Sequence, residues 1–364
     1  MRCKQDVELP VRRDVFTLIQ IDAIDSNKSK INAGASQRNH DKATIDTNVL
    51  SSSPNLAVIP YPSEDQRKRC QIVYILGAEG TMHHGVEPVL TTLAKHQKNP
   101  ETGVSYDVQF GSEDLRYGLF AYPAGRFGFT EPPPIDDPQL VSKVITAICP
   151  DDGKKHIIIE STSFPSGGKY HAMSRVRRQS AWHHMTPEGI ANSFAALNHP
   201  TNLYQFYDAY HRYADIKFLV LHRPFLNTIA SHKNFDSGPM VHANVVQGYL
   251  ILLSRFLDTH RFDKLTGGKI WTLLHVDRIS SKYYADTSGN HEDNSLNSQL
   301  NEARNVMVRN LAMFLNWPQV ECPNCFDSWV DSTTDYVKIL GNFNVKKLTK
   351  QWEKLESIWP PQES

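Results

Sequence analysis

Several absences narrow the classes of protein to which this chain can belong. Lys and Arg together number 39, as do Asp and Glu, so neither sign of charge is in excess. We therefore expect no nucleic-acid partner that is held by overall charge. No apolar run approaches the roughly 18 residues of a membrane-spanning helix. The longest candidate, Val15–Ile24, is interrupted by Gln20 and Asp22, so we expect no transmembrane segment.

Cysteine is also scarce, with five residues in a chain of 364. This number is too low for a disulfide scaffold. Cys322 and Cys325 have the CxxC spacing, but no second pair completes a zinc site. The spacing therefore favours a local disulfide or two free thiols over a metal. The N-terminus lacks the pattern of a signal peptide, and the compartment stays open between the Golgi lumen and the cytoplasm.

Aromatic residues are few in residues 1–69, which are rich in Ser, Asn, Asp and Lys. A segment of this composition cannot bury enough apolar surface to offset the entropy lost on ordering. We therefore expect a disordered or weakly structured tail over residues 1–69. The folded domain is expected over residues 70–360.

Short apolar runs alternate with stretches of helical spacing through the rest of the chain. The apolar runs predict buried strands, at Ile72–Leu76, Tyr106–Phe110, His156–Glu160, Phe218–Leu221 and Lys269–His275. Helical spacing predicts helices at about 85–98, 140–148, 204–213, 225–232, 245–257, 300–314 and 345–358. The alternation predicts an α/β fold, a three-layer domain with a mainly parallel central sheet flanked by helices.

The first predicted strand runs into a glycine-containing loop, Gly77-Ala78-Glu79-Gly80-Thr81-Met82, and then into a helix. A strand, loop and helix in this order present backbone N–H groups and a helix N-terminus to a phosphate. The loop is not a Walker A motif, because it lacks Gly-Lys-Ser/Thr. An ordinary tight turn between a strand and a helix would use glycine equally well.

The fourth predicted strand ends at His222-Arg223-Pro224, and a helix follows with Ser231 about two turns along it. Ligands of open α/β sheets bind outside the carboxyl ends of the strands. An arginine fork and a hydroxyl at such an edge suit a phosphate. The alternatives are that Arg223 caps a helix or pairs with a surface carboxylate.

In this order the two loops resemble those of the sulfotransferase superfamily, whose members use 3′-phosphoadenosine 5′-phosphosulfate. The turn at Gly80 and Thr81 matches the loop that holds the 5′-phosphosulfate in that family. Arg223 and Ser231 match the pair that holds the 3′-phosphate, both in spacing and in placement.

Two later stretches add to the resemblance, which covers about Gln71 to Pro318. His275–Ile279 resembles the family's Tyr-Glu-Asp-Leu-like stretch, and Phe314–Trp317 resembles its closing Phe-Leu-Gly-Trp-like helix end. The resemblance implies a P-loop-like domain that transfers a sulfuryl group to an acceptor hydroxyl or amine. The partners would be the nucleotide cosubstrate and an acceptor that the sequence does not identify: a carbohydrate, a protein or a small molecule. The product 3′,5′-bisphosphoadenosine would leave, and the reaction would need no metal.

One residue departs from the family pattern, because Ala78 stands where the family carries Lys or Arg. That cation meets the bridging oxygen as negative charge builds on the leaving group. His83, His84 or a residue of the basic patch Arg175–Arg178 is a candidate to replace it. Glu113 sits roughly where the protein-tyrosine branch has its catalytic Glu.

The missing cation keeps other interpretations open. A catalytically impaired relative would only bind the nucleotide. Another nucleotide-using transferase, such as a glycosyltransferase, would need an Asp-x-Asp metal motif, and we find none in a suitable loop. Adjacent histidines on a helix point in different directions, so neither His83 with His84 nor His183 with His184 is expected to share a metal.

Overall fold

A computed structural model describes residues 61–78, 80–110, 138–164, 185–195, 203–231, 239–280, 293–329 and 345–362. Several residues singled out above lie outside these ranges, namely residues 1–60 of the expected tail, Glu79, Glu113, Arg175–Arg178 and His183-His184.

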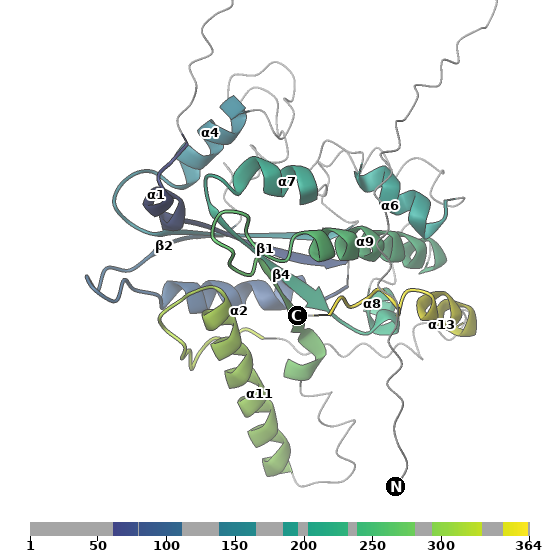
Figure 1. The fold of residues 1–364 in the computed structure, drawn as a ribbon. Coiled ribbons are helices and arrows are strands. Elements are labelled where there is room, and N and C mark those ends of the chain that lie inside the picture. The colour runs from purple at the N-terminus through teal and green to yellow at the C-terminus, as the bar shows by residue number, and fades with distance from the viewer. Residues whose placement is uncertain are drawn as a thin grey trace, which may run out of the picture. The chain divides into compact units, whose positions relative to one another are not determined.

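Five parallel strands form one sheet in the described part of the chain, in the order β2-β3-β1-β4-β5 (Figure 1). The strands are β1 (Cys70–Ala78), β2 (Asp107–Phe110), β3 (His156–Phe164), β4 (Asp215–His222) and β5 (Trp271–His275). All five coincide with apolar runs predicted to be strands. The predicted α/β class with a parallel sheet is therefore confirmed, and the described sheet is parallel throughout.

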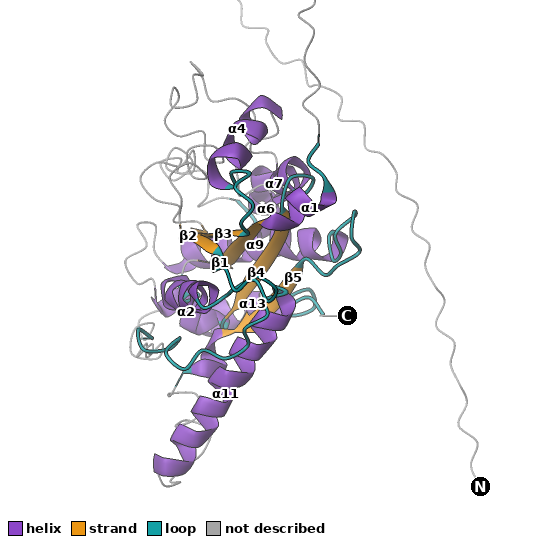
Figure 2. Ribbon diagram, turned by 90° about the vertical axis from the view of Figure 1, so that its left-hand side faces the viewer, coloured by secondary structure: helices purple, strands orange, loops and turns teal. Residues whose placement is uncertain are grey.

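Helices cover both faces of this sheet, as Figure 2 shows from the side. On one side lie α4 (Pro138–Ile148), α6 (Pro187–Ala195), α7 (Leu203–Tyr210) and α9 (Pro239–Thr259) (Figure 1). On the other side lie α2 (His83–Lys95) and α11 (Asp293–Phe314). The remaining described helices are α1 (Glu64–Arg69), α8 (Phe225–Ser231), the 3₁₀ helix η2 (Val276–Ile279) and α13 (Val345–Glu353).

Strand β1 contributes to a separate hydrophobic core on each face of the sheet. Tyr74 and Leu76 point into the core that is shared with α4, α7 and α9. Val73 and Ile75 point into the core that is shared with α2 and α11. This alternation explains the continuous apolar run of β1, since both faces of a central parallel strand are buried.

The predicted closing stretch of α11 anchors the helix to the amino end of the sheet. Asn316 has a φ of 55°, a left-handed conformation in which Asn commonly ends a helix. The indole Nε1 of the buried Trp317 donates to the side-chain oxygen of Gln71 at 2.7 Å. This end of α11 therefore holds the sheet in place and lies away from the carboxyl ends of the strands.

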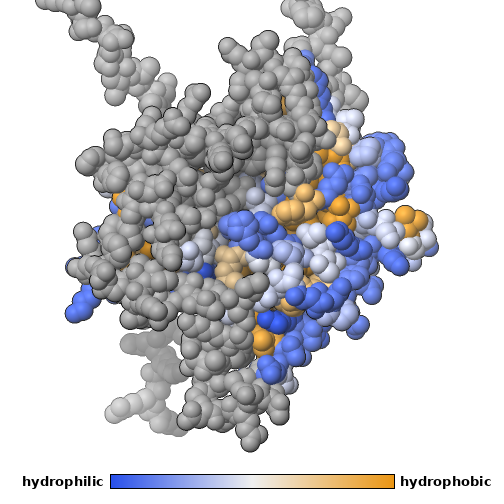
Figure 3. All heavy atoms as spheres, turned by 180° about the vertical axis from the view of Figure 1, so that it is seen from behind, coloured by the Kyte–Doolittle hydropathy of each residue, from blue (hydrophilic) through white to orange (hydrophobic). Residues whose placement is uncertain are grey.

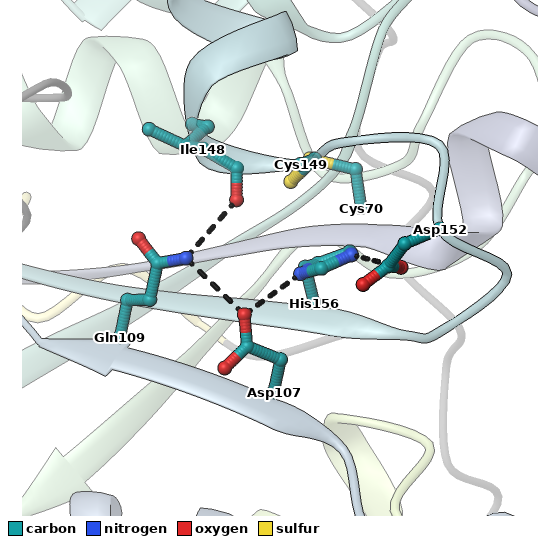
Figure 4. The surroundings of a disulfide bond; sticks show 7 residues. All are labelled: Cys70, Asp107, Gln109, Ile148, Cys149, Asp152 and His156. Carbon is teal, nitrogen blue, oxygen red and sulfur yellow. Dashed lines mark hydrogen bonds and ion pairs between the residues drawn. A yellow bond between two sulfur atoms is a disulfide. The ribbon is translucent and has the colours of Figure 1, made fainter.

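A disulfide that the sequence did not predict joins the start of β1 to the end of α4. Cys70 and Cys149 are 79 residues apart in the chain, and their Cα atoms are 5.6 Å apart (Figure 4). Beside the bond, the ring nitrogens of His156 contact carboxylate oxygens of Asp107 at 3.0 Å and of Asp152 at 2.9 Å. The cluster joins the amino ends of β1, β2 and β3, opposite the edge where ligands of such sheets bind.

The second described disulfide links Cys322 to Cys325, with their Cα atoms 5.4 Å apart. The CxxC spacing favoured either a local disulfide or two free thiols, and the structure has the disulfide. The Sγ atom of Cys322 also lies 3.4 Å from Nδ1 of His96, next to the end of α2. The bond therefore stabilises the loop that follows α11.

The part of the described surface that is visible in Figure 3 is mixed in character. On the face shown in Figure 3, most of it is hydrophilic, and hydrophobic residues gather in separate patches. No helix in the described ranges has the length and apolar character needed to cross a membrane.

Helix α1 (Glu64–Arg69) lies within residues 1–69, which we expected to form a disordered or weakly structured tail. Arg67 of α1 is buried, and its guanidinium forms an ion pair with the buried Asp263 at 3.1 Å. The side chain of Ser63 accepts a hydrogen bond from the backbone N–H of Gln66 and caps the helix. The sequence did not reveal α1, because its six residues include no apolar side chain.

The ion pair of α1 predicts different effects for two truncations. Removing residues 1–60 should leave the free energy of unfolding nearly unchanged. Removing residues 1–68 should lower it by roughly 3 kcal/mol or more, because Asp263 then stays buried without its cationic partner. Chemical denaturation of the two variants and the full chain measures the difference. Equal stability of the two truncated proteins would contradict the structural role of α1.

Candidate functional site

The carboxyl ends of β1 and β4 lie side by side and carry the two loops singled out in the sequence. β1 pairs directly with β4, and the arrowhead of β4 ends beside α8 (Figure 1). After β1 the chain continues toward β2 and β3 on one side, whereas β4 is followed by β5 on the other side. Such a reversal opens a crevice between the two loops, which is where open α/β sheets bind ligands.

The loop between β1 and α2 folds back closely over the end of β1. Thr81 donates to the carbonyl oxygen of Ala78 twice, from its backbone N–H at 3.0 Å and from its hydroxyl at 2.7 Å. A Cβ atom at Gly77 would collide with the Thr81 hydroxyl. Met82 then takes a left-handed conformation, with a φ of 66°, and α2 begins at the next residue. The glycine at position 77 is thus required by close packing.

Arg223 and Ser231 meet at one atom of this loop, the carbonyl oxygen of Gly80. The guanidinium Nη1 of Arg223 donates to it at 2.7 Å, and the hydroxyl of Ser231 donates to it at 3.1 Å. Arg223 is 5% exposed, whereas Ser231 reaches the surface. The two residues that the sequence paired by spacing are therefore brought together, and they join the loop after β4 to the loop after β1.

Arg223 also has a carboxylate neighbour, as one of the sequence alternatives proposed. Its Nε lies 3.5 Å from Oδ1 of Asp277, which belongs to η2 directly after β5. Burial lowers the pKa of Arg223, and Asp277 opposes this shift; burial likewise raises the pKa of Asp277, which Arg223 opposes. The guanidinium stays charged, so the site keeps a buried positive group with a carboxylate on one side.

Two histidines at the same edge form a pair that sequence analysis missed. His222 and His275 are partners in the register of β4 and β5, and their Nδ1 atoms lie 3.1 Å apart. Burial, followed by the proximity of His275, lowers the pKa of His222 to about 4. At neutral pH one ring therefore donates and the other accepts. The available sequence signal was the position of both histidines at the end of a predicted strand, since His222 directly follows Leu221 and His275 is the last residue of Lys269–His275.

The C-terminal segment covers the position where the resemblance would place a basic side chain. Ala78 is 1% exposed, and it lines a cavity of only about 10 Å³ whose other lining residues include Trp352 and Trp359. That volume holds about one water molecule. The cavity is therefore too small for a lysine side chain from position 78, and no motif in the sequence indicated that the C-terminal residues would approach Ala78.

A larger cavity of about 440 Å³ lies beside the same tryptophans. Its lining combines aromatic rings with a few polar groups: His222, Phe225, Asn227, Thr349, Trp352, Glu356 and Trp359. Trp352 stacks on Phe225 with ring centroids 4.4 Å apart and an interplanar angle of 15°. The size and lining are those of a small-molecule site.

His83 and His84 lie close together at the start of α2, contrary to the expectation that adjacent histidines point apart. Their ring centroids are 3.9 Å apart. His83 is buried, and the exposed His84 lies 3.8 Å from a carboxylate oxygen of Glu87, measured from its Nδ1. The two rings share one side of the first helical turn, where the backbone is still leaving the left-handed turn at Met82.

The other expected catalytic positions are placed only in part. Glu113, Glu79 and the patch Arg175–Arg178 lie outside the described residues. Within β3, Ser163 pairs in register with Gly77 and so lies near the loop after β1. Glu160 is buried within β3.

Comparison with known proteins does not assign a family to this chain. No family model, no curated protein and no solved structure matches it. The geometry of the two loops and the motifs in the sequence are therefore the features from which a function can be inferred.

The close approach of Gly80 to α8 predicts a measurable cost for a side chain at that position. Gly80 has a φ of 95°, and a Cβ there would collide with the Ser231 hydroxyl and the Thr228 carbonyl oxygen. Gly103 also has a positive φ, of 70°, but has open space around it. Gly103→Ala should cost roughly 1 kcal/mol of unfolding free energy from backbone strain alone. Gly80→Ala should cost about 2 kcal/mol more, from overpacking. Equal losses in denaturant titrations would show that the loop does not contact α8.

Proposed function

We propose that the carboxyl ends of β1 and β4 bind 3′-phosphoadenosine 5′-phosphosulfate, and that the protein transfers its sulfuryl group to an acceptor hydroxyl or amine. One observation carries the proposal. Arg223 and Ser231, which match a phosphate-binding pair in sequence, donate to the same carbonyl oxygen of the loop after β1. Three parts of the resemblance, the two loops and the stretch with Asp277, thus meet at one point.

The proposed site has the groups that an anionic ligand needs. Arg223 supplies a charged fork of donors, and Ser231 supplies a hydroxyl at the surface of the same helix–loop unit. The first turn of α2 adds the positive end of a helix of 13 residues. The strand order β2-β3-β1-β4-β5, with the glycine loop leading from β1 into a helix, supports a P-loop-like arrangement.

The cavity beside Trp352 and Trp359 is the proposed place for the nucleotide base. It adjoins Pro224 and Phe225, the residues that directly follow Arg223. Its volume of about 440 Å³ suffices for a purine nucleoside, and its indole rings offer faces for stacking. A base there would leave the 3′-phosphate near Arg223.

The bound cosubstrate supplies an activated sulfuryl group, and the chain positions it and stabilises charge. Most of the rate acceleration would come from alignment of the acceptor and from donors aimed at the leaving oxygen. His83 and His84, at the start of α2, are the residues proposed to face the leaving oxygen. Glu113 is the proposed base for the acceptor proton.

A second candidate function, nucleotide binding without transfer, is favoured by the surroundings of Ala78. The cavity that Ala78 lines together with Trp352 and Trp359 is too small for a basic side chain from position 78. Release of 3′,5′-bisphosphoadenosine from the cosubstrate, in the presence of a panel of hydroxyl and amine acceptors, separates the two functions. Tight binding without any release would favour the second.

The phosphate site predicts selective losses of nucleotide affinity, which calorimetry can measure. Ser231→Ala and Arg223→Gln should each weaken 3′,5′-bisphosphoadenosine by about tenfold or more, the cost of a charge-assisted contact of roughly 1.5–3 kcal/mol. Both should change the affinity for adenosine 5′-monophosphate, which lacks the 3′-phosphate, about twofold at most.

Ser231→Ala should disturb the fold less than Arg223→Gln, because Ser231 is exposed whereas Arg223 is buried beside Asp277. Arg212→Gln removes an arginine that contacts Tyr61 and should change neither affinity. Equal weakening of both nucleotides by Ser231→Ala and Arg223→Gln would sink the assignment.

A further inference from the structure

We propose that His83, His84 and Glu87 bind a divalent transition metal, with zinc the best match, at the start of α2. The nitrogen and oxygen atoms through which these three residues would bind all lie within 4.8 Å of one another. The role that we give the metal rests on the proposed nucleotide site, whereas its binding does not.

The three residues share one side of the helix for two geometric reasons. Glu87 follows His83 by four positions and His84 by three, the spacings that place side chains on one helical face. The rings of His83 and His84 converge because they belong to the first residues of α2, directly after the left-handed Met82. A pair of adjacent histidines within the body of a helix would point about 100° apart.

The donor set indicates the kind of metal. Two imidazoles and one carboxylate are a set that catalytic zinc sites use, with a fourth position left for water or substrate. Magnesium and calcium prefer all-oxygen surroundings, which this group does not offer. Ligand atoms around tetrahedral zinc lie about 3.3 Å apart, so the cluster must close by an ångström or more. The exposed ring of His84 and the side chain of Glu87 can rotate to do so without moving the backbone.

The local charges act on a bound cation in opposite directions. The positive end of α2 opposes the cation, and this effect falls off beyond the first helical turn. The carboxylate of Glu87 offsets one of the two metal charges. A net positive charge remains beside the loop formed by Gly80 and Thr81.

This placement gives the metal a function at the proposed site. The chain has no basic residue between Gly77 and Met82, and the small cavity beside Ala78, which Trp352 and Trp359 also line, leaves no room for one at position 78. A metal with an open position would accept an oxygen of the bound phosphosulfate and so supply positive charge to the leaving group. The resemblance alone implied a reaction without a metal, and the structure gives this chain a different source of charge.

Titration of the metal-free full chain with Co²⁺ and Zn²⁺ tests the site. We expect one equivalent of Co²⁺ to give the visible ligand-field absorption of a four-coordinate ion, and Zn²⁺ to displace it. His84→Ala and Glu87→Gln should each weaken binding at least tenfold. Both residues are on the helix surface or near it, so thermal unfolding should show the variants folded.

The control variant is His96→Ala. It removes the histidine at the opposite, C-terminal end of α2 and should leave metal affinity unchanged. Stoichiometric binding that survives both His84→Ala and Glu87→Gln would overturn the proposal, as would binding weaker than about 100 μM. Nucleotide affinity measured in the presence of a metal chelator tests the proposed function independently of the metal site. Nucleotide binding that persists there while no metal binds would reject only the metal site.

Discussion

The carbonyl oxygen of Gly80 is the point on which the organisation of the site depends. It accepts hydrogen bonds from Arg223 and Ser231, so one backbone atom joins the loop after β1 to the helix that follows β4. A glycine is needed there, because its φ is 95° and α8 leaves no room for a Cβ. The arrangement fixes a buried guanidinium and a surface hydroxyl next to the N-terminus of α2. The pairing of two adjacent parallel strands thus brings together the groups of the proposed anion site.

The amino and carboxyl ends of the parallel strands have different structural roles. At the amino edge, the disulfide between Cys70 and Cys149 and the contacts of His156 with Asp107 and Asp152 join three strands and a helix. Disulfides between distant cysteines persist mainly in oxidising compartments. At the carboxyl edge the polar side chains converge on the loops instead. The contacts at the amino ends therefore hold in place the strands whose carboxyl ends form the candidate site.

The fold could be predicted from the sequence because its signals are local. A strand that is buried on both faces needs a continuous apolar run, and Ile72–Leu76 and Phe218–Leu221 show one. The pairing of Arg223 with Ser231 could also be predicted, since both lie on one strand–helix unit. Helix α1 could not, because its contribution is the ion pair between Arg67 and Asp263 and not an apolar face.

The residues that surround the site could not be predicted from the sequence, because contacts between distant parts of the chain bring them together. Trp352 and Trp359 reach Ala78 from the opposite end of the sequence, and His222 meets His275 only through strand pairing. The convergence of His83 and His84 depends on the backbone angle at Met82, which spacing alone does not reveal. Arg223 and Ser231 could thus be singled out from local spacing, whereas the residues that surround them could not.

The central claim is that the loops after β1 and β4 bind one nucleotide between them. Hydrogen exchange of the full chain, with and without 3′,5′-bisphosphoadenosine, tests this claim most directly. The account predicts slower exchange in two separate stretches, residues 80–87 and 225–232, because both loops would contact the same ligand. Protection of only one stretch, or protection confined to other parts of the chain, would contradict it.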